Sequence, residues 1–108
     1  MSERMKAEKI APLLEKIREG IDSGRYVHTR HATKRQNERS IIVPDILYVL
    51  RKGYHEKKKD SWDKRCKTWC YSIRGKTIDG AELRIIVSFD KNGMLIITVI
   101  RLGKMRKL

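Results

Sequence analysis

Cysteine, proline and aromatic side chains are scarce in this 108-residue sequence. It contains two cysteines and two prolines, and phenylalanine, tryptophan and tyrosine make up only 6% of it. Two cysteines are too few for a disulfide framework. If Cys66 and Cys70 share one strand, they stand ~13 Å apart and cannot bond to each other. We therefore expect reduced thiols, as in cytoplasmic proteins.

Long apolar runs are missing as well. No stretch approaches the ~20 apolar residues of a membrane span, and residues 1–6 lack the apolar run of a secretory signal. A helix that lies on a membrane surface needs a wide apolar face with aromatic anchors, and no segment has one. The sequence thus predicts a cytoplasmic protein without a membrane partner.

Acidic residues are outnumbered two to one. Lysine and arginine number 26 against 13 aspartates and glutamates, which gives a net charge of +13 and a pI near 10.1. An excess of this size raises the local concentration of polyanions and speeds their capture. RNA, DNA and acidic proteins are the partners that fit such a chain.

Hydrophobic periodicity predicts a helical first half and a strand-rich second half. Helices are expected over about 11–21 and 44–52, with a polar helix between them that Thr29 can cap. A short strand is expected at 25–28, an edge strand and basic loop at 54–67, and alternating strands over 69–74, 83–89 and 94–101.

These elements predict the α+β class, with N-terminal helices packed on one face of a small antiparallel sheet. A hydrophobic content of 40% suffices for one modest core. We divide the chain into an N-terminal helical extension at 1–24, a single α+β domain at 25–103 and a basic tail at 104–108.

The last hairpin allows the strand register to be predicted. A three-residue loop at 91–93 with a glycine bulge would pair Asp90 with Met94 and place Ile85 opposite Val99. Arg84 and Thr98 then share one face of the sheet. The opposite, core face carries Leu83, Ile85, Val87, Phe89, Leu95, Ile97 and Val99.

The polar helix at 31–39 has only one apolar residue, Ala32, so burial of an apolar stripe cannot hold it in place. At helical spacing His31, Arg35 and Arg39 lie on one face, where they could hold a phosphate. A histidine in a first helical turn tends to stay neutral and can accept a proton, because the helix dipole disfavours the imidazolium. The plain alternative is a solvated, charged helix face.

Cleavage of RNA by its own 2′-hydroxyl requires a base, a cation that holds the phosphate and an acid for the departing 5′-oxygen. His31 could act as the base or the acid, and the arginines could hold the phosphate. Thr98 joins them through its predicted place on the Arg84 face, although threonine in mid-strand often serves β-propensity alone. The predicted catalytic set, which uses no cofactor, is His31, Arg35, Arg39, Arg84 and Thr98.

Other residues predict binding rather than chemistry. Lys34, Lys57, Lys58 and Lys59 could attract phosphates without sequence preference, and Trp62 in the basic loop could stack on a base. Trp69 and Tyr71 are expected in the core. A zinc site of His28, His31, Cys66 and Cys70 is disfavoured, because two cysteines four apart on a strand cannot converge on one ion. We expect no metal.

Three strings of residues resemble a known family. They are His31-Ala32-x-x-Arg35-x-x-Glu38-Arg39-x-Ile41, then Pro44-Asp45-Ile46-x-x-Val49-Leu50-x-x-Gly53, and Leu83-Arg84-Ile85-Ile86-Val87 with Ile97-Thr98-Val99. Over about residues 25–101 the chain is similar to the small bacterial family called domain of unknown function 4258. That family is similar in architecture to the RelE/ParE and BrnT toxins, which include metal-independent ribonucleases and toxins neutralised by an antitoxin.

The resemblance implies a RelE-like fold and a toxin-type, metal-independent endoribonuclease held in check by an acidic antitoxin protein, with the ribosome as a further candidate partner. An alternative is a non-catalytic nucleic-acid-binding module that uses the same basic face. A ParE-like toxin acting on a protein target, gyrase, also stays open, because a fold does not decide its target.

Overall fold

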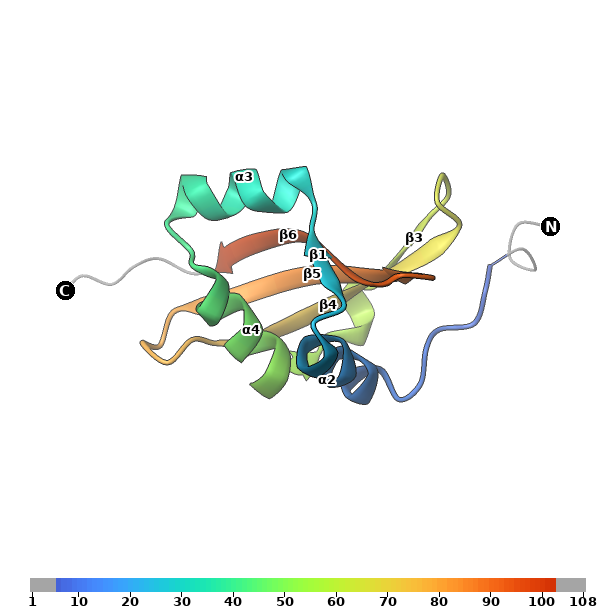
Figure 1. Cartoon of the computed structure of the whole chain (residues 1–108), viewed down its shortest axis with the longest axis horizontal. Coiled ribbons are helices and arrows are strands. Elements are labelled where there is room, and N and C mark those ends of the chain that lie inside the picture. Colours follow the sequence, from blue (N-terminus) through green and yellow to red (C-terminus); the bar gives the residue numbers. More distant parts are fainter. Residues whose placement is uncertain (1–5, 103–108) are drawn as a thin grey trace.

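Three helices and six strands make up the computed structural model, which describes residues 6–102 (Figure 1). The helices are α2 (Leu13–Ser23), α3 (Arg30–Arg39) and α4 (Val43–Lys52), and a short 3-10 turn, η1, covers Lys57–Lys59. The strands are β1 (Tyr26–His28), β2 (Tyr54–His55), β3 (Ser61–Asp63), β4 (Thr68–Lys76), β5 (Glu82–Asp90) and β6 (Gly93–Leu102). None of the helices in the described range is long and apolar enough to cross a membrane. The predicted basic tail at 104–108 lies outside the described residues.

The sheet has the strand order β1-β6-β5-β4-β2, and β3 pairs with the other half of β4. The three long strands, β4, β5 and β6, are antiparallel to one another, as the short turns between them require. The prediction of a wholly antiparallel sheet is wrong at one edge, where β1 runs parallel to β6. Because β1 stands between two helices, no hairpin turn fixes its direction.

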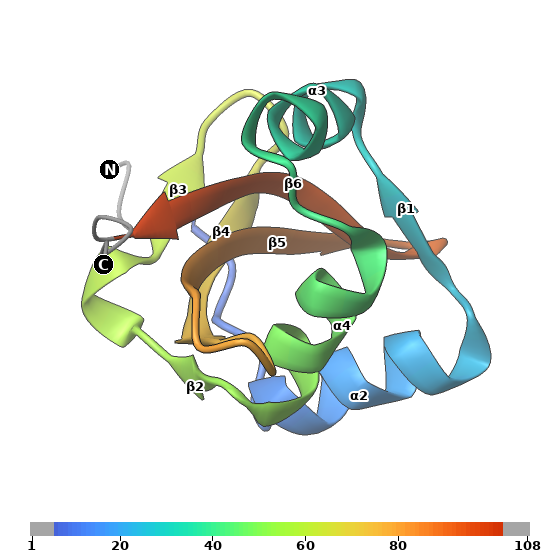
Figure 2. The ribbon, with the colours of Figure 1, turned by 90° about the vertical axis from the view of Figure 1, so that its left-hand side faces the viewer.

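The core lies between one face of the sheet and the helices α2 and α4 (Figure 2). Ile17 of α2 and Ile46 of α4 are completely buried, as are Ile73 and Ile85 of the sheet. This arrangement confirms the predicted α+β class. Residues 13–23, expected as part of an extension, contribute to the same core as the rest of the chain.

The register of β5 and β6 confirms one prediction and corrects another. Ile85 lies opposite Val99 and Ile86 opposite Thr98, so Arg84 and Thr98 share the face away from the core. The predicted loop is wrong: Asp90 pairs with Gly93 across a two-residue turn, and the irregularity falls later, where Ile97 is left without a partner. As a result Met94 and Ile96 are buried instead of the predicted Leu95 and Ile97.

Candidate nucleic-acid interface

Helix α3 lies along the edge of β6, beyond the point where β1 ends (Figures 1 and 2). Thr29 fixes its start: the hydroxyl accepts a hydrogen bond from the Ala32 amide at 3.1 Å and donates one to the Ile97 carbonyl at 3.0 Å. At the other end, Arg101 Nη2 donates to the Arg39 carbonyl at 3.1 Å. Polar contacts at both ends thus hold a helix that has almost no apolar surface to bury.

The face of α3 toward the protein buries only Ala32 and Gln36. The Gln36 side chain makes a hydrogen bond of 2.7 Å to Nδ1 of His28 on β1. Burial lowers the pKa of His28, which favours the neutral imidazole that can accept this bond. His28 therefore helps to position α3. Within residues 6–102, no three His, Cys, Asp or Glu side chains cluster closely enough to hold a metal ion.

The outer face of α3 is strongly basic. Arg30, His31 and Lys34 are exposed, and Glu38 is the one carboxylate in the helix. Arg35 pairs with Glu38 at 2.9 Å, with both side chains well exposed at 38% and 43%. Nη1 of Arg39 is buried and has no hydrogen-bond partner within the described part of the chain. The donors that this face offers to an anion are therefore those of the exposed side chains, Arg30 and Lys34, and of Arg35.

Arg84 has a different environment from the arginines of α3. Its Nε and Nη2 donate to the two carboxylate oxygens of Glu56 at 2.7 and 3.0 Å, and both side chains are largely buried. Ser72 and Arg74 also donate to Glu56. The forked hydrogen bonds from Arg84 lower the pKa of Glu56 from 4.5 to about 2. The guanidinium predicted to hold phosphate is thus already neutralised by a carboxylate.

The predicted catalytic set divides into two groups. His31, Arg35 and Arg39 share α3, whereas Arg84 and Thr98 lie on the sheet face away from the core. Across residues 6–102, no hydrogen bond or ion pair joins a member of one group to a member of the other. The backbone provides one indirect link between the groups. Thr98 directly follows Ile97, whose carbonyl accepts a hydrogen bond from Thr29, the cap of α3.

The segment 57–67 carries the other predicted binding residues. Lys57, Lys58 and Lys59 are exposed on η1, and Trp62 is half-buried on β3. Tyr71 is in the core as expected, whereas Trp69 is only partly buried at its margin. The loop between β3 and β4 adds exposed cations that the sequence analysis did not single out, although the basic composition of 54–67 was their signal. They are Lys64, Arg65 and Lys67.

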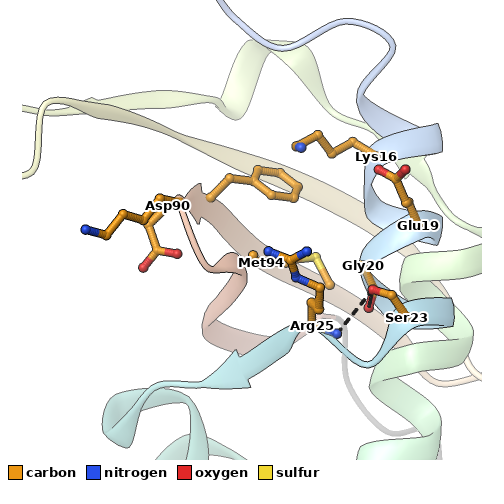
Figure 3. Close-up of a pocket in the computed structure, with 10 residues that line it drawn as sticks. Lys16, Glu19, Gly20, Ser23, Arg25, Asp90 and Met94 are labelled. Atoms are coloured by element: carbon orange, nitrogen blue, oxygen red, sulfur yellow. Dashed lines mark hydrogen bonds between the residues drawn. The ribbon is translucent and has the colours of Figure 1, made fainter.

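A cavity of about 280 Å³ opens elsewhere, between α2 and the turn that joins β5 to β6 (Figure 3). Its lining mixes charges, with Lys16 and Arg25 near Glu19 and Asp90, and Lys16 Nζ stands 5.5 Å from the centre of the Phe89 ring. None of the predicted site residues lines this cavity. The basic surface of α3 is therefore the better candidate for phosphate binding.

Comparison with known families gives one match. The family model described as domain of unknown function (DUF4258) matches residues 28–101, a range that includes α3, α4, the strands β2 to β5 and nearly all of β6. The comparisons with curated proteins and with solved structures gave no match. The chain belongs to the DUF4258 family.

Proposed function

We propose that this DUF4258 protein binds RNA, with the outer face of α3 as its main contact with the phosphate backbone. The observation that carries the proposal is that cations on this helix are exposed and that a single carboxylate accompanies them. Arg30 and Lys34 are exposed, and Glu38 is the helix's one carboxylate. Guanidinium and ammonium groups in this state are available to phosphate oxygens.

The Arg35–Glu38 pair does not prevent such binding. A pair between exposed side chains contributes only ~0–1 kcal/mol, because water screens it and both side chains lose freedom. A phosphate of the RNA backbone can therefore replace the carboxylate of Glu38 at Arg35. The same exchange at Arg84 would have to break two hydrogen bonds to a buried carboxylate.

Matched lysine variants test this proposal. We expect Lys34→Ala on α3 to weaken the binding of a fluorescent RNA several-fold and to lower the magnitude of the salt slope by about one. Lys52→Ala removes a charge that is also exposed, from the end of α4, and should leave the affinity near that of the parent. Equal affinities of the two variants would contradict the assignment of the interface to α3.

A second candidate function is metal-independent cleavage of the bound RNA. The observation that favours it is the exposed imidazole of His31, one helical turn before Arg35 and on the same polar helix. His31 would take the proton of a 2′-hydroxyl as that oxygen attacks phosphorus. The P–O5′ bond would break, leaving a 2′,3′-cyclic phosphate and a 5′-oxygen that receives a proton from water. The family's resemblance to RelE/ParE toxins adds the proposal of a toxin role with an acidic antitoxin.

Incubation of the protein with labelled RNA in EDTA separates the two candidates. Fragments with cyclic-phosphate ends would support the endoribonuclease. RNA that stays intact but is bound in a salt-dependent manner would support binding alone.

A further inference from the structure

Two tryptophans face each other across the β3–β4 hairpin, and in residues 6–102 only Trp69 has a side-chain hydrogen bond and a lysine over its ring. Trp62 pairs with Trp69, and the rings meet edge to face with their centres 5.5 Å apart. Trp69 Nε1 donates to the Ala7 carbonyl at 2.7 Å, and Lys9 Nζ stands 4.6 Å from the centre of its ring. Among residues 6–102, no hydrogen bond or cation–π contact of this kind engages Trp62.

The cations around Trp62 are not neutralised by neighbouring acids. Asp60 is committed to His55 and Lys9, and the Asp63 carboxylate accepts bonds from the backbone amides of Arg65 and Cys66. None of the basic side chains of 57–67 forms an ion pair with a carboxylate in the part of the chain that the structure describes. These side chains are Lys57, Lys58, Lys59, Lys64, Arg65 and Lys67.

The hairpin and helix α3 extend to the same side of the molecule. In both Figure 1 and Figure 2 they form the upper rim, with β6 below them. A polyanion bound along α3 can therefore continue toward the hairpin. The two contact regions differ in chemistry, because α3 offers mainly charges whereas the hairpin adds an aromatic ring.

We propose that the β3–β4 hairpin recognises an unpaired nucleotide, with a base stacked on Trp62 and the flanking phosphates held by the cations of 57–67. A base in a duplex has both faces covered by its neighbours, whereas a single strand can place one face on an aromatic side chain. This inference rests on the proposed RNA binding and adds that the bound strand is single. The stacking is sequence-tolerant, because every base has an aromatic face.

Oligonucleotides with and without bases test the stacking. The probes are a fluorescent strand of about 15 deoxyadenosines, which spans at least one typical binding site, and an abasic strand of equal length and charge. Neither has a 2′-hydroxyl, so cleavage cannot interfere. We expect the wild-type protein to bind the strand with bases roughly 5- to 150-fold more tightly, which is the range measured for base–aromatic stacking. Equal affinities would overturn the inference, and no binding of either strand would contradict the phosphate contacts on which the proposed function rests.

Variants then locate the effect. Trp62→Ala should remove the preference for the strand with bases, and Trp62→Phe should retain most of it. Tyr54→Ala removes an aromatic side chain that is 55% exposed outside the hairpin, and it should change nothing. A Trp62→Ala protein that melts at the parent temperature and keeps the full preference would overturn the assignment to Trp62. If that variant is unfolded, Trp62→Leu, which keeps an apolar side chain without an aromatic face, takes its place.

Discussion

Arg35 and Arg84 show how burial decides what an arginine can do. Both are predicted phosphate ligands, but Arg35 shares an exposed pair with Glu38, whereas Arg84 makes a forked pair with the buried Glu56. The partner of Arg35 is three residues away and is visible in the sequence. Glu56 and Arg84 are 28 residues apart, so only the fold reveals that they meet.

Replacing Glu56 should be costly to the fold. Glu56→Gln leaves the guanidinium of Arg84 largely buried without its counterion, and we expect the free energy of unfolding to fall by about 2–4 kcal/mol near neutral pH. Glu82→Gln is the matched control, since Glu82 pairs with Arg74 where both side chains are 32% exposed. That change should lower the free energy of unfolding much less, because water screens the exposed pair. Denaturant unfolding measures both, and equal losses would contradict the distinction.

The contribution of Glu56 should depend on pH in a defined direction. Its pKa is about 2 in the folded protein and 4.5 ordinarily, so the ionised form favours folding. The stabilisation is fully present above pH 4.5 and is lost as the pH falls from there toward 2. The difference in unfolding free energy between the parent and Glu56→Gln should therefore narrow across this window. A difference that stays constant from neutral pH down to pH 2 would refute this explanation.

A substitution of His31 distinguishes RNA cleavage from RNA binding. Because its side chain is exposed, His31→Ala should leave the melting temperature unchanged, and loss of one imidazole should have little effect on affinity. If the protein cleaves RNA, the rate should fall by ~10²–10⁴. Arg39→Ala should lower affinity as well as rate, because a guanidinium that holds phosphate acts in both the bound and the transition state. Unaltered cleavage by His31→Ala would remove His31 from the mechanism.

At the scale of elements, α3 depends on its cap more than an amphipathic helix does. Thr29→Ala removes the bonds to the Ala32 amide and the Ile97 carbonyl, which should cost about 1–2 kcal/mol. The helix has little buried apolar surface to compensate, so RNA affinity should fall with stability. Thr29→Ser should retain both properties, and Thr33→Ala, at an exposed position of the same helix, should be nearly neutral. Full RNA affinity in Thr29→Ala would contradict the role of α3.

The positions of the elements could be predicted from the sequence. The face that a strand turns to the core could not be predicted where both of its alternating sets of side chains are apolar. The cap at Thr29, the polar helix and the strand β1 were all predicted close to their observed places. In β6 both alternating sets are apolar, since Met94 and Ile96 alternate with Leu95 and Ile97. Local pattern cannot decide which set faces the core. The irregularity at Ile97 determines that Met94 and Ile96 face the core. The carbonyl of the same Ile97 accepts the hydrogen bond from Thr29.

At the scale of the whole molecule, the family match and the folded unit do not coincide. The match begins at residue 28, yet α2 precedes it and supplies Leu13 and Ile17 to the core. The separation of the predicted catalytic residues is likewise a property of the whole fold. Helical spacing places His31, Arg35 and Arg39 on one helix, but no spacing rule relates them to Arg84 on β5.

The net charge of +13 is also a property of the whole chain, and it bears directly on RNA binding. Of the lysines and arginines within residues 6–102, only Lys9, Arg35, Arg51, Arg74 and Arg84 form ion pairs with carboxylates. Most of the described basic residues are thus available to a polyanion, and each phosphate contact releases condensed counterions.

The most direct test of RNA binding is a titration of fluorescent single-stranded RNA at a series of salt concentrations, in EDTA. We expect the logarithm of the association constant to fall linearly with the logarithm of the salt concentration, with a slope of several units in magnitude. Lys34→Ala should lower that magnitude by about one. An affinity that does not change with salt, or no binding at the lowest salt concentration, would contradict the central claim.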